Sequence, residues 1–127
     1  MPHHILLVED NELNLDMLTR RLERLGFQIS HAVNGREAVD QARALRPDLI
    51  LMDINIPVMD GYDATVEIRQ TPATADIPII ALTAHALPED ESRARAVGMN
   101  DFATKPIDFQ GLIDKINAWL IGAGPER

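Results

Sequence analysis

The chain has 127 residues and 46% apolar content, which suits one domain with a sizeable core. It has no cysteine, which excludes disulfides and thiolate-bound metals, and its formal net charge of -8 opposes nonspecific binding to nucleic acid or anionic lipid. The apolar runs are too short to cross a bilayer and no secretory signal is present, so we expect a cytoplasmic protein that binds neither DNA nor membrane directly. We assign residues 1–121 to one domain and expect residues 122–127 to fray.

The first half of the chain alternates predicted strands with amphipathic helices. Ile5–Val8 is continuously apolar, a pattern typical of a strand that is covered on both faces of a parallel sheet. Phe27–Ala32 alternates apolar and polar residues, which predicts an edge strand, and Leu49–Met52 is again continuously apolar. The intervening helices carry apolar stripes that we expect to face the sheet: Leu15, Leu18, Leu22 and Leu25 in the first, and Ala38, Ala42 and Leu45 in the second.

The second half continues this alternation. Ile79–Leu82 predicts a further interior strand, and the short, partly apolar segment Asp101–Thr104 predicts the second edge strand. Between them, Leu87–Val97 carries five charged residues, so the fourth helix should have a thin apolar stripe and be weakly held. Residues typical of helix ends are Asn34 with Glu37 as a capping box, Asp60 and Asp108 as N-caps, and Gly26 and Gly98 at carboxyl ends.

Five strands alternating with five helices indicate an α/β fold in which right-handed crossovers join parallel strands. With the second and fifth strands at the edges, the simplest strand order is 2-1-3-4-5, a flavodoxin-like doubly wound sheet between two layers of helices. In such sheets a ligand binds beyond the carboxyl ends of the strands, where the winding direction reverses. Here that point lies between the first and third strands.

Charged and hydroxyl side chains stand at this edge of the predicted sheet. Glu9 and Asp10 follow the first strand, Asp53 the third, Thr83 the fourth and Lys105 the fifth. Two carboxylates about 4 Å apart repel by roughly 4 kcal/mol at an effective dielectric of about 20, so the acids require shared protons or a cation. Oxygen ligands with room for several waters suit Mg²⁺. Taken singly, Asp10 and Asn11 also suit capping of the first helix, which needs no metal.

These residues resemble the receiver domains of two-component response regulators, from Ile5 to about Leu120. The matching segments are Leu6–Asn11, Leu51–Tyr62, Ala81–Ala86 and Lys105–Pro106. The resemblance implies that Asp53 is the phospho-acceptor and forms an acidic pocket with Glu9 and Asp10, although many relatives have Asp where this chain has Glu9. It also implies that Thr83 contacts the phosphoryl group, that Lys105 is its basic partner, and that Phe102 is the aromatic switch residue.

The resemblance implies a metal set and a signalling role as well. Asp10, Asp53 and the main-chain carbonyl of Asn55 would hold Mg²⁺ directly, and Glu9 would hold it through water. A histidine kinase or a histidine phosphotransfer protein would donate the phosphoryl group, and the only catalysis expected is self-phosphorylation and self-dephosphorylation of Asp53. The segments Asp10–Asn14 and Ala81–Ala86 look more like receivers of hybrid kinases and phosphorelays than like receivers fused to DNA-binding domains.

The resemblance also implies a conformational switch at this pocket and residues that adjust the rate of dephosphorylation. A phosphoryl group on Asp53 would draw in Thr83, Phe102 would fill the space that is vacated, and the face of the fourth helix, fifth strand and fifth helix would change shape. A partner or a second copy in a phosphorylation-dependent homodimer could bind that face. Asn55 and His85 are candidates for tuning dephosphorylation. The plain alternatives are a static core role for Phe102, a solvent-exposed loop position for His85 and an ordinary surface position for Lys105.

Three other functional classes fit these residues less well. A haloacid-dehalogenase-type phosphatase needs a second Asp two residues after the nucleophile, where this chain has Asn55. A flavodoxin cradles phosphate with a hydroxyl-rich loop after the first strand, where this chain has Glu9, Asp10 and Glu12. A degenerate receiver would act only as an interaction module, but no member of the pocket is absent here.

Pro106 after Lys105 favours a fixed turn, compatible with a cis peptide, that aims the lysine inward.

Overall fold

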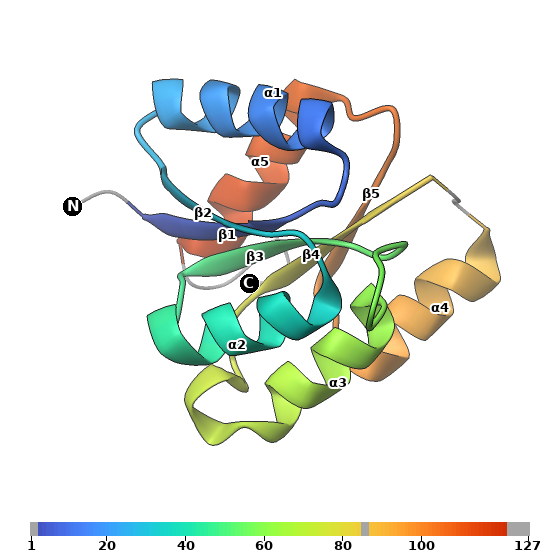
Figure 1. Ribbon diagram of the computed structural model, residues 1–127. Helices are drawn as coiled ribbons and strands as arrows, with labels where there is room; N and C mark the ends of the chain where they lie inside the picture. The colour runs from blue at the N-terminus through green and yellow to red at the C-terminus, as the bar shows by residue number, and fades with distance from the viewer. Residues whose placement is uncertain (1–2, 85–86, 122–127) are drawn as a thin grey trace.

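The computed structural model describes residues 3–84 and 87–121. Its centre is a sheet of five parallel strands in the order β2-β1-β3-β4-β5, which confirms the predicted topology (Figure 1). The strands are β1 (His4–Val8), β2 (Gln28–Ala32), β3 (Leu49–Asp53), β4 (Ile79–Thr83) and β5 (Asp101–Thr104). As predicted, β2 and β5 are the edges, and every residue of β3 and β4 is buried.

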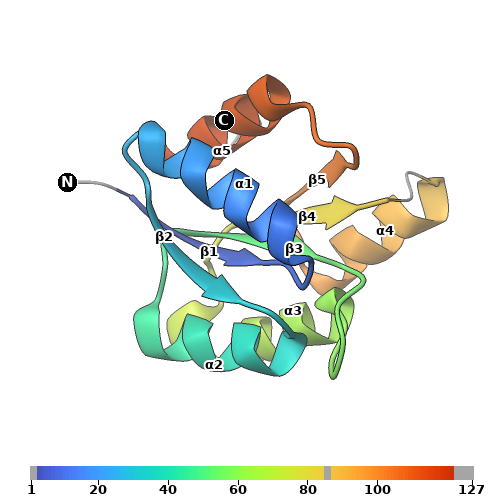
Figure 2. The same cartoon turned by 45° about the horizontal axis from the view of Figure 1, so that its top comes forward.

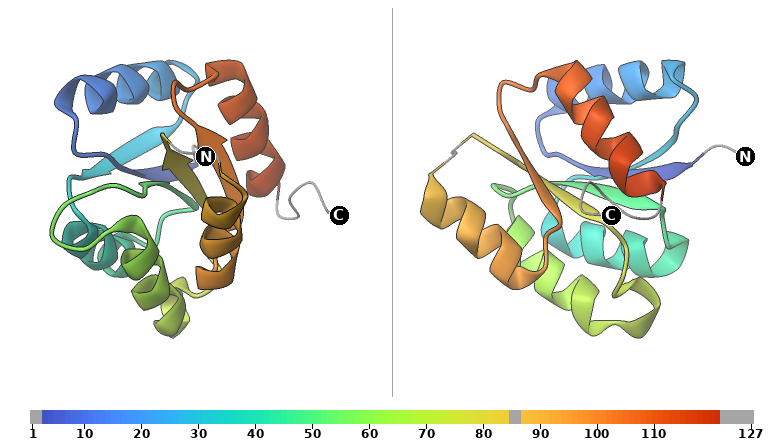
Figure 3. Two further views of the ribbon diagram at one scale, coloured as in Figure 1. Left: turned by 90° about the vertical axis from the view of Figure 1, so that its right-hand side faces the viewer. Right: turned by 180° about the vertical axis from the view of Figure 1, so that it is seen from behind.

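Helices cover both faces of the sheet. On one face lie α1 (Glu12–Arg24) and α5 (Phe109–Leu120), and on the other lie α2 (Gly35–Leu45), α3 (Gly61–Gln70) and α4 (Pro88–Val97), as Figures 1 and 3 show. A short 3₁₀ helix, η1 (Pro72–Thr74), follows α3. The side chains form two buried apolar clusters, one for each face, because neighbouring residues of a strand point to opposite sides. Leu6 and Val8 belong to one cluster and Ile5 and Leu7 to the other.

Most predicted helix ends are confirmed. The side chains of Asn34 and Asp60 accept the amides of Glu37 and Asp63 at 2.8 and 2.9 Å, and Asn11 accepts the amide of Asn14 at 3.0 Å. Gly26 lies two residues after the end of α1 and Gly98 lies directly after the end of α4, with φ values of 95° and 107°, which glycine adopts without strain. Asp108 occupies the N-cap position of α5, but its side chain makes no capping bond.

The predicted apolar stripes need a correction at their ends. Leu18 and Leu22 of α1 and Ala38 and Ala42 of α2 are buried as expected, but Leu25 is 55% exposed and Leu45 is 43% exposed. Leu25 comes after the last residue of α1, and Leu45 is the last residue of α2. The helical period of the apolar residues continues past the part of each helix that contacts the sheet, so the predicted buried stripe was too long.

The fourth helix has the thin packing that its composition predicted. Ala94 is the only residue of α4 that is buried. The carboxyl end of α4 is better anchored, because the side chain of Arg69 donates from Nε to the Gly98 carbonyl at 2.9 Å and from Nη2 to Asn100 Oδ1 at 2.7 Å. None of the helices in the described residues is long and apolar enough to cross a membrane. The predicted frayed tail, residues 122–127, lies outside the described residues.

Candidate functional site

The strand register brings the predicted polar residues to one edge of the sheet. Because the strands of the sheet are parallel, their carboxyl ends lie at one edge, and Met52 of β3 is level with Val8 of β1. Asp53 is level with Leu82, and Thr83 is level with Thr104. The residues that end or follow these strands, namely Glu9, Asp53, Thr83 and Lys105, therefore stand side by side although 96 positions separate the first from the last.

Asp53 is a buried carboxylate whose two oxygens each have a partner. Only 3% of the residue is exposed. Lys105 Nζ lies 2.9 Å from Asp53 Oδ2, and the main-chain N–H of Asn55 donates to Asp53 Oδ1 at 3.0 Å. The carboxylate is thus oriented from two sides.

Glu9 is also buried and shares the same lysine. Lys105 Nζ lies 3.1 Å from Glu9 Oε1, and the N–H of Asn11 donates to Glu9 Oε2 at 3.2 Å. Burial raises the pKa of Glu9, the nearby Asp53 carboxyl adds to this effect, and Lys105 opposes it. Burial alone would lower the pKa of Lys105, but Asp53 and Glu9 outweigh it, and the pKa of Lys105 is raised. Lys105 is therefore positively charged at neutral pH.

Three carboxyl groups converge here, and their residues fit a hard divalent cation. Oxygen atoms of Glu9, Asp10 and Asp53 all lie within 4.8 Å of one another. Glu9 and Asp53 are buried whereas Asp10 is exposed, so one side of the cluster is open to solvent. A set of oxygen ligands that leaves room for water suits Mg²⁺. Lys105 supplies a single positive charge against three acids.

The other predicted site residues are placed as follows. Thr83 is buried at the end of β4, and Asn55 is exposed two residues after Asp53. Phe102 is partly buried on edge strand β5, level with Ala81, and packs against the cluster on the α4 side of the sheet. His85 lies outside the described residues. The Lys105–Pro106 peptide bond is cis, as the sequence interpretation allowed.

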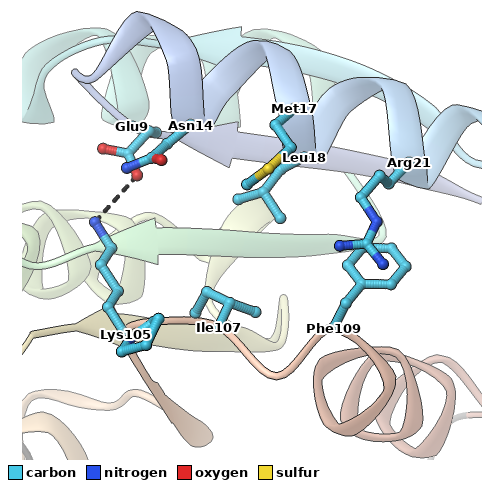
Figure 4. A pocket seen from close by; sticks show the side chains of 9 residues that line it. Glu9, Asn14, Met17, Leu18, Arg21, Lys105, Ile107 and Phe109 are labelled. Carbon is cyan, nitrogen blue, oxygen red and sulfur yellow. Dashed lines mark hydrogen bonds and ion pairs between the residues drawn. The ribbon is translucent and has the colours of Figure 1, made fainter.

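A groove that the sequence reading missed begins at the acidic pocket. It has a volume of about 620 Å³ and runs between α1 and the connection from β5 to α5. Glu9 and Lys105 stand at one end, apolar side chains including Leu18 and Ile107 line its middle, and Arg21 lies over the Phe109 ring at the other end, 3.8 Å from the centroid (Figure 4). Met17 also lines it and is 49% exposed. The sequence feature that could have indicated this groove is Met17, an apolar residue next to the leucine stripe of α1.

A second missed feature holds β5 to α5. Asp101 accepts Trp119 Nε1–H at 2.9 Å, Lys115 Nζ at 3.1 Å and the N–H of Phe102 at 2.8 Å. The sequence pattern identifies Asp101 only as the start of an edge strand. An acidic residue at the head of a strand, with the single tryptophan of the chain 18 positions later, is too common a pattern to predict such a contact.

Comparisons with known proteins agree with this geometry. The profile of the response regulator receiver domain matches residues 5–117. The polar-differentiation response regulator DivK of Brucella anthropi is 40% identical over 120 residues, which cover 94% of this chain and 98% of that protein.

Solved structures show the same relationship. The receiver domain of the sensor histidine kinase PA1611 of Pseudomonas aeruginosa, crystallised with a magnesium ion in the active site cleft, has a TM-score of 0.89 and 40% identity, covering 96% of this chain and all of that one. The receiver domain of Ssk1 of Saccharomyces cerevisiae, crystallised with the histidine phosphotransfer protein Ypd1, has a TM-score of 0.87 and 32% identity, covering 94% and 90%. The chain therefore belongs to the response regulator receiver domain family of two-component signalling.

Proposed function

We propose that Asp53 accepts a phosphoryl group from a phosphohistidine partner in a Mg²⁺-dependent reaction. The observation that carries this proposal is the state of the Asp53 carboxylate. It is 3% exposed, it is oriented by Lys105 at 2.9 Å and by the N–H of Asn55 at 3.0 Å, and it is within 4.8 Å of two other acids. A carboxylate with a purely structural role would not need other negatively charged carboxylates close to it.

The acidic cluster would hold the metal. Asp10, Asp53 and the Asn55 carbonyl are the proposed direct ligands, and Glu9 is the proposed ligand through water. When bound, Mg²⁺ neutralises phosphoryl oxygens and the carboxylates that face them. The magnesium ion of the PA1611 receiver domain supports this choice of cation.

The residues of this chain supply positioning and charge. A carboxylate oxygen of Asp53 attacks phosphorus, so that a P–O bond forms while the P–N bond to the donor breaks and its electron pair stays on the imidazole nitrogen. Lys105 provides a positive charge next to the attacking carboxylate, and Thr83 provides a hydroxyl at the adjacent strand end. Asn55 and His85 are the residues that we propose to tune hydrolysis of the phosphoaspartate.

The partner would be a histidine kinase or a histidine phosphotransfer protein. Because Asp53 is buried, its carboxylate does not extend beyond the pocket, and the donor imidazole must enter past the rim of the pocket. The groove between α1 and the β5–α5 connection adjoins that rim and has an apolar middle that suits a helix of the donor. The Ypd1–Ssk1 complex is a precedent for such a partner.

The output would be a change in the face formed by α4, β5 and α5. Phe102 lies on β5 and packs against the apolar cluster that includes Ala94 of the weakly packed α4, so a movement of Thr83 toward a phosphoryl group could be transmitted to this face. A phosphorylation-dependent homodimer is one outcome that this face could support. A cytoplasmic location and a domain boundary at residue 121 remain predictions from the sequence.

Intact mass after incubation with acetyl phosphate tests the central proposal. Wild-type protein with Mg²⁺ should gain one acid-labile phosphoryl group, and Asp53→Asn should gain none. Asp60→Asn is a matched control, because Asp60 belongs to the same loop but caps α3. Labelling of Asp53→Asn, or equal labelling of wild type in excess chelator, would refute the proposal.

A further inference from the structure

Gly35, the first residue of α2, lies directly against the main chain of the loop that follows β3. A Cβ atom at position 35 would lie 2.6 Å from the Met59 carbonyl carbon and 2.8 Å from Met59 Cβ, and still closer to the Met59 carbonyl oxygen. Ordinary van der Waals contact begins at 3.4 Å. Because two of these three atoms belong to the main chain, a rotamer change cannot make room for a side chain. Figures 1 and 2 show this loop beside the start of α2.

Main-chain hydrogen bonds hold the loop on both sides of this contact. The N–H of Met59 donates to the Pro57 carbonyl at 2.8 Å, which closes a three-residue turn with Val58 at a φ of 72°. At its base, the N–H of Gly61 donates to the Ile54 carbonyl at 2.9 Å. A displacement at Met59 should therefore be passed along the loop rather than absorbed at one residue.

Asn55 connects this loop to the phosphorylation site. Its N–H donates to Asp53 Oδ1 at 3.0 Å, and its carbonyl is a proposed metal ligand. We infer that Gly35 is a positioning residue for the chemistry at Asp53: its lack of a side chain lets the 54–60 loop settle on α2 and so sets the orientation of the Asn55 main chain. The expected effect of Gly35 on labelling rests on the proposed function. Its expected effect on the Asn55 main chain does not depend on that function.

Gly35→Ala tests the inference, with Gly111→Ala as the matched control. Gly111 also lies in the first turn of a helix, but there the three atoms nearest to an added Cβ all belong to the Asp108 side chain, the closest being Oδ2 at 2.7 Å, and this side chain can rotate away. Both variants are compared with wild type at a temperature at which circular dichroism shows them folded. The measurements are the Asn55 amide resonance in metal-free protein, the Mg²⁺ dissociation constant by calorimetry and the rate of labelling by acetyl phosphate.

We expect Gly35→Ala to shift the Asn55 resonance and to weaken Mg²⁺ binding and slow labelling by roughly 10- to 100-fold, the scale that a misplacement of about 1 Å produces. Gly111→Ala should match wild type in all three measurements. A wild-type Asn55 resonance and a wild-type Mg²⁺ dissociation constant in Gly35→Ala would overturn the inference. If wild type itself is not labelled, the proposed function fails, while the Asn55 resonance still decides the role of Gly35.

Val58→Gly is a second test that does not depend on the folding of Gly35→Ala. Val58 is 80% exposed, and glycine accepts its φ without strain, so this variant should fold. It frees the turn but leaves the contact between Gly35 and Met59 intact. We expect it to retain the wild-type Asn55 resonance and Mg²⁺ affinity. A loss of both would assign the positioning to the Val58 turn instead and overturn the inference.

Discussion

Lys105 Nζ lies 2.9 Å from Asp53 Oδ2, although the two residues are 52 positions apart in the chain. The same ammonium lies 3.1 Å from Glu9 Oε1. A single ammonium group therefore faces two carboxyl groups that are almost fully buried. This relationship makes the charge balance of the pocket a determinant of stability as well as of chemistry.

Lys105→Met should destabilise the metal-free protein. Removal of one partner of a fully buried ion pair costs about 3–5 kcal/mol. Because the Lys105 side chain is 24% exposed, we expect a smaller loss of about 1–3 kcal/mol in the free energy of unfolding by urea. Arg20→Met is the control, since its pair with Asp16 is exposed and should contribute at most about 1 kcal/mol. Equal losses in the two variants would contradict this reading.

Asp10→Asn should remove most of the stabilisation by Mg²⁺. If the cation binds only the folded state, a concentration of about 100 times its dissociation constant adds roughly 2.7 kcal/mol to the wild type. The variant lacks the exposed carboxyl of the cluster, so its melting temperature should respond little to Mg²⁺, and its metal-free melting temperature should not fall because one repulsive charge is gone. Asp16→Asn, an exposed acid on α1 outside the cluster, should respond like wild type. An undiminished response in Asp10→Asn would place the metal elsewhere.

Asp101→Asn should change how stability depends on acid pH. Burial alone would raise the pKa of Asp101, but hydrogen bonds from Trp119 and from the N–H of Phe102, together with Lys115, outweigh burial and hold this pKa below its ordinary value. Such a carboxyl contributes stability that is fully present above the unfolded pKa, about 3.9, and is lost as the pH falls through the lower folded pKa.

The difference in unfolding free energy between wild type and Asp101→Asn should therefore be largest near neutral pH, at about 1–3 kcal/mol, and shrink at pH values below about 4. Urea unfolding across this range measures it. Asp114→Asn, an exposed acid on the same helix as Trp119, should show a small difference. A wild-type advantage over Asp101→Asn that stays constant with pH would refute the prediction.

Thr83→Ala should uncouple the proposed phosphorylation site from α4. The variant should still bind beryllofluoride, a phosphoryl mimic, at Asp53, but the amide shifts of α4 and Phe102 that accompany binding should be smaller than in wild type. A coupling free energy of about 1–3 kcal/mol is the usual scale for such a link. Thr104→Ala is the control, because Thr104 is level with Thr83 on the neighbouring strand but exposed. Equally large shifts in Thr83→Ala and wild type would exclude this route.

The sequence alone determined the sheet and the position of the candidate site. Continuous apolar runs identified β1, β3 and β4 because a strand covered on both faces cannot alternate. Once the strands were known to be parallel, Glu9, Asp53 and Lys105 had to meet at one edge, whatever their separation along the chain. Helix ends such as Asn34 and Asp60 were also predictable, since a capping bond joins residues only three positions apart.

Only the tertiary structure decided the contacts between elements that are distant in the sequence. Leu25 and Leu45 obey the helical period yet are exposed, because the period does not show where the sheet ends beneath a helix. The bonds of Asp101 with Trp119 and the contact of Gly35 with Met59 depend on how whole elements pack. Local patterns encode which face of an element is buried, but the distance and rotation between packed elements follow from the combined shape of side chains across the core.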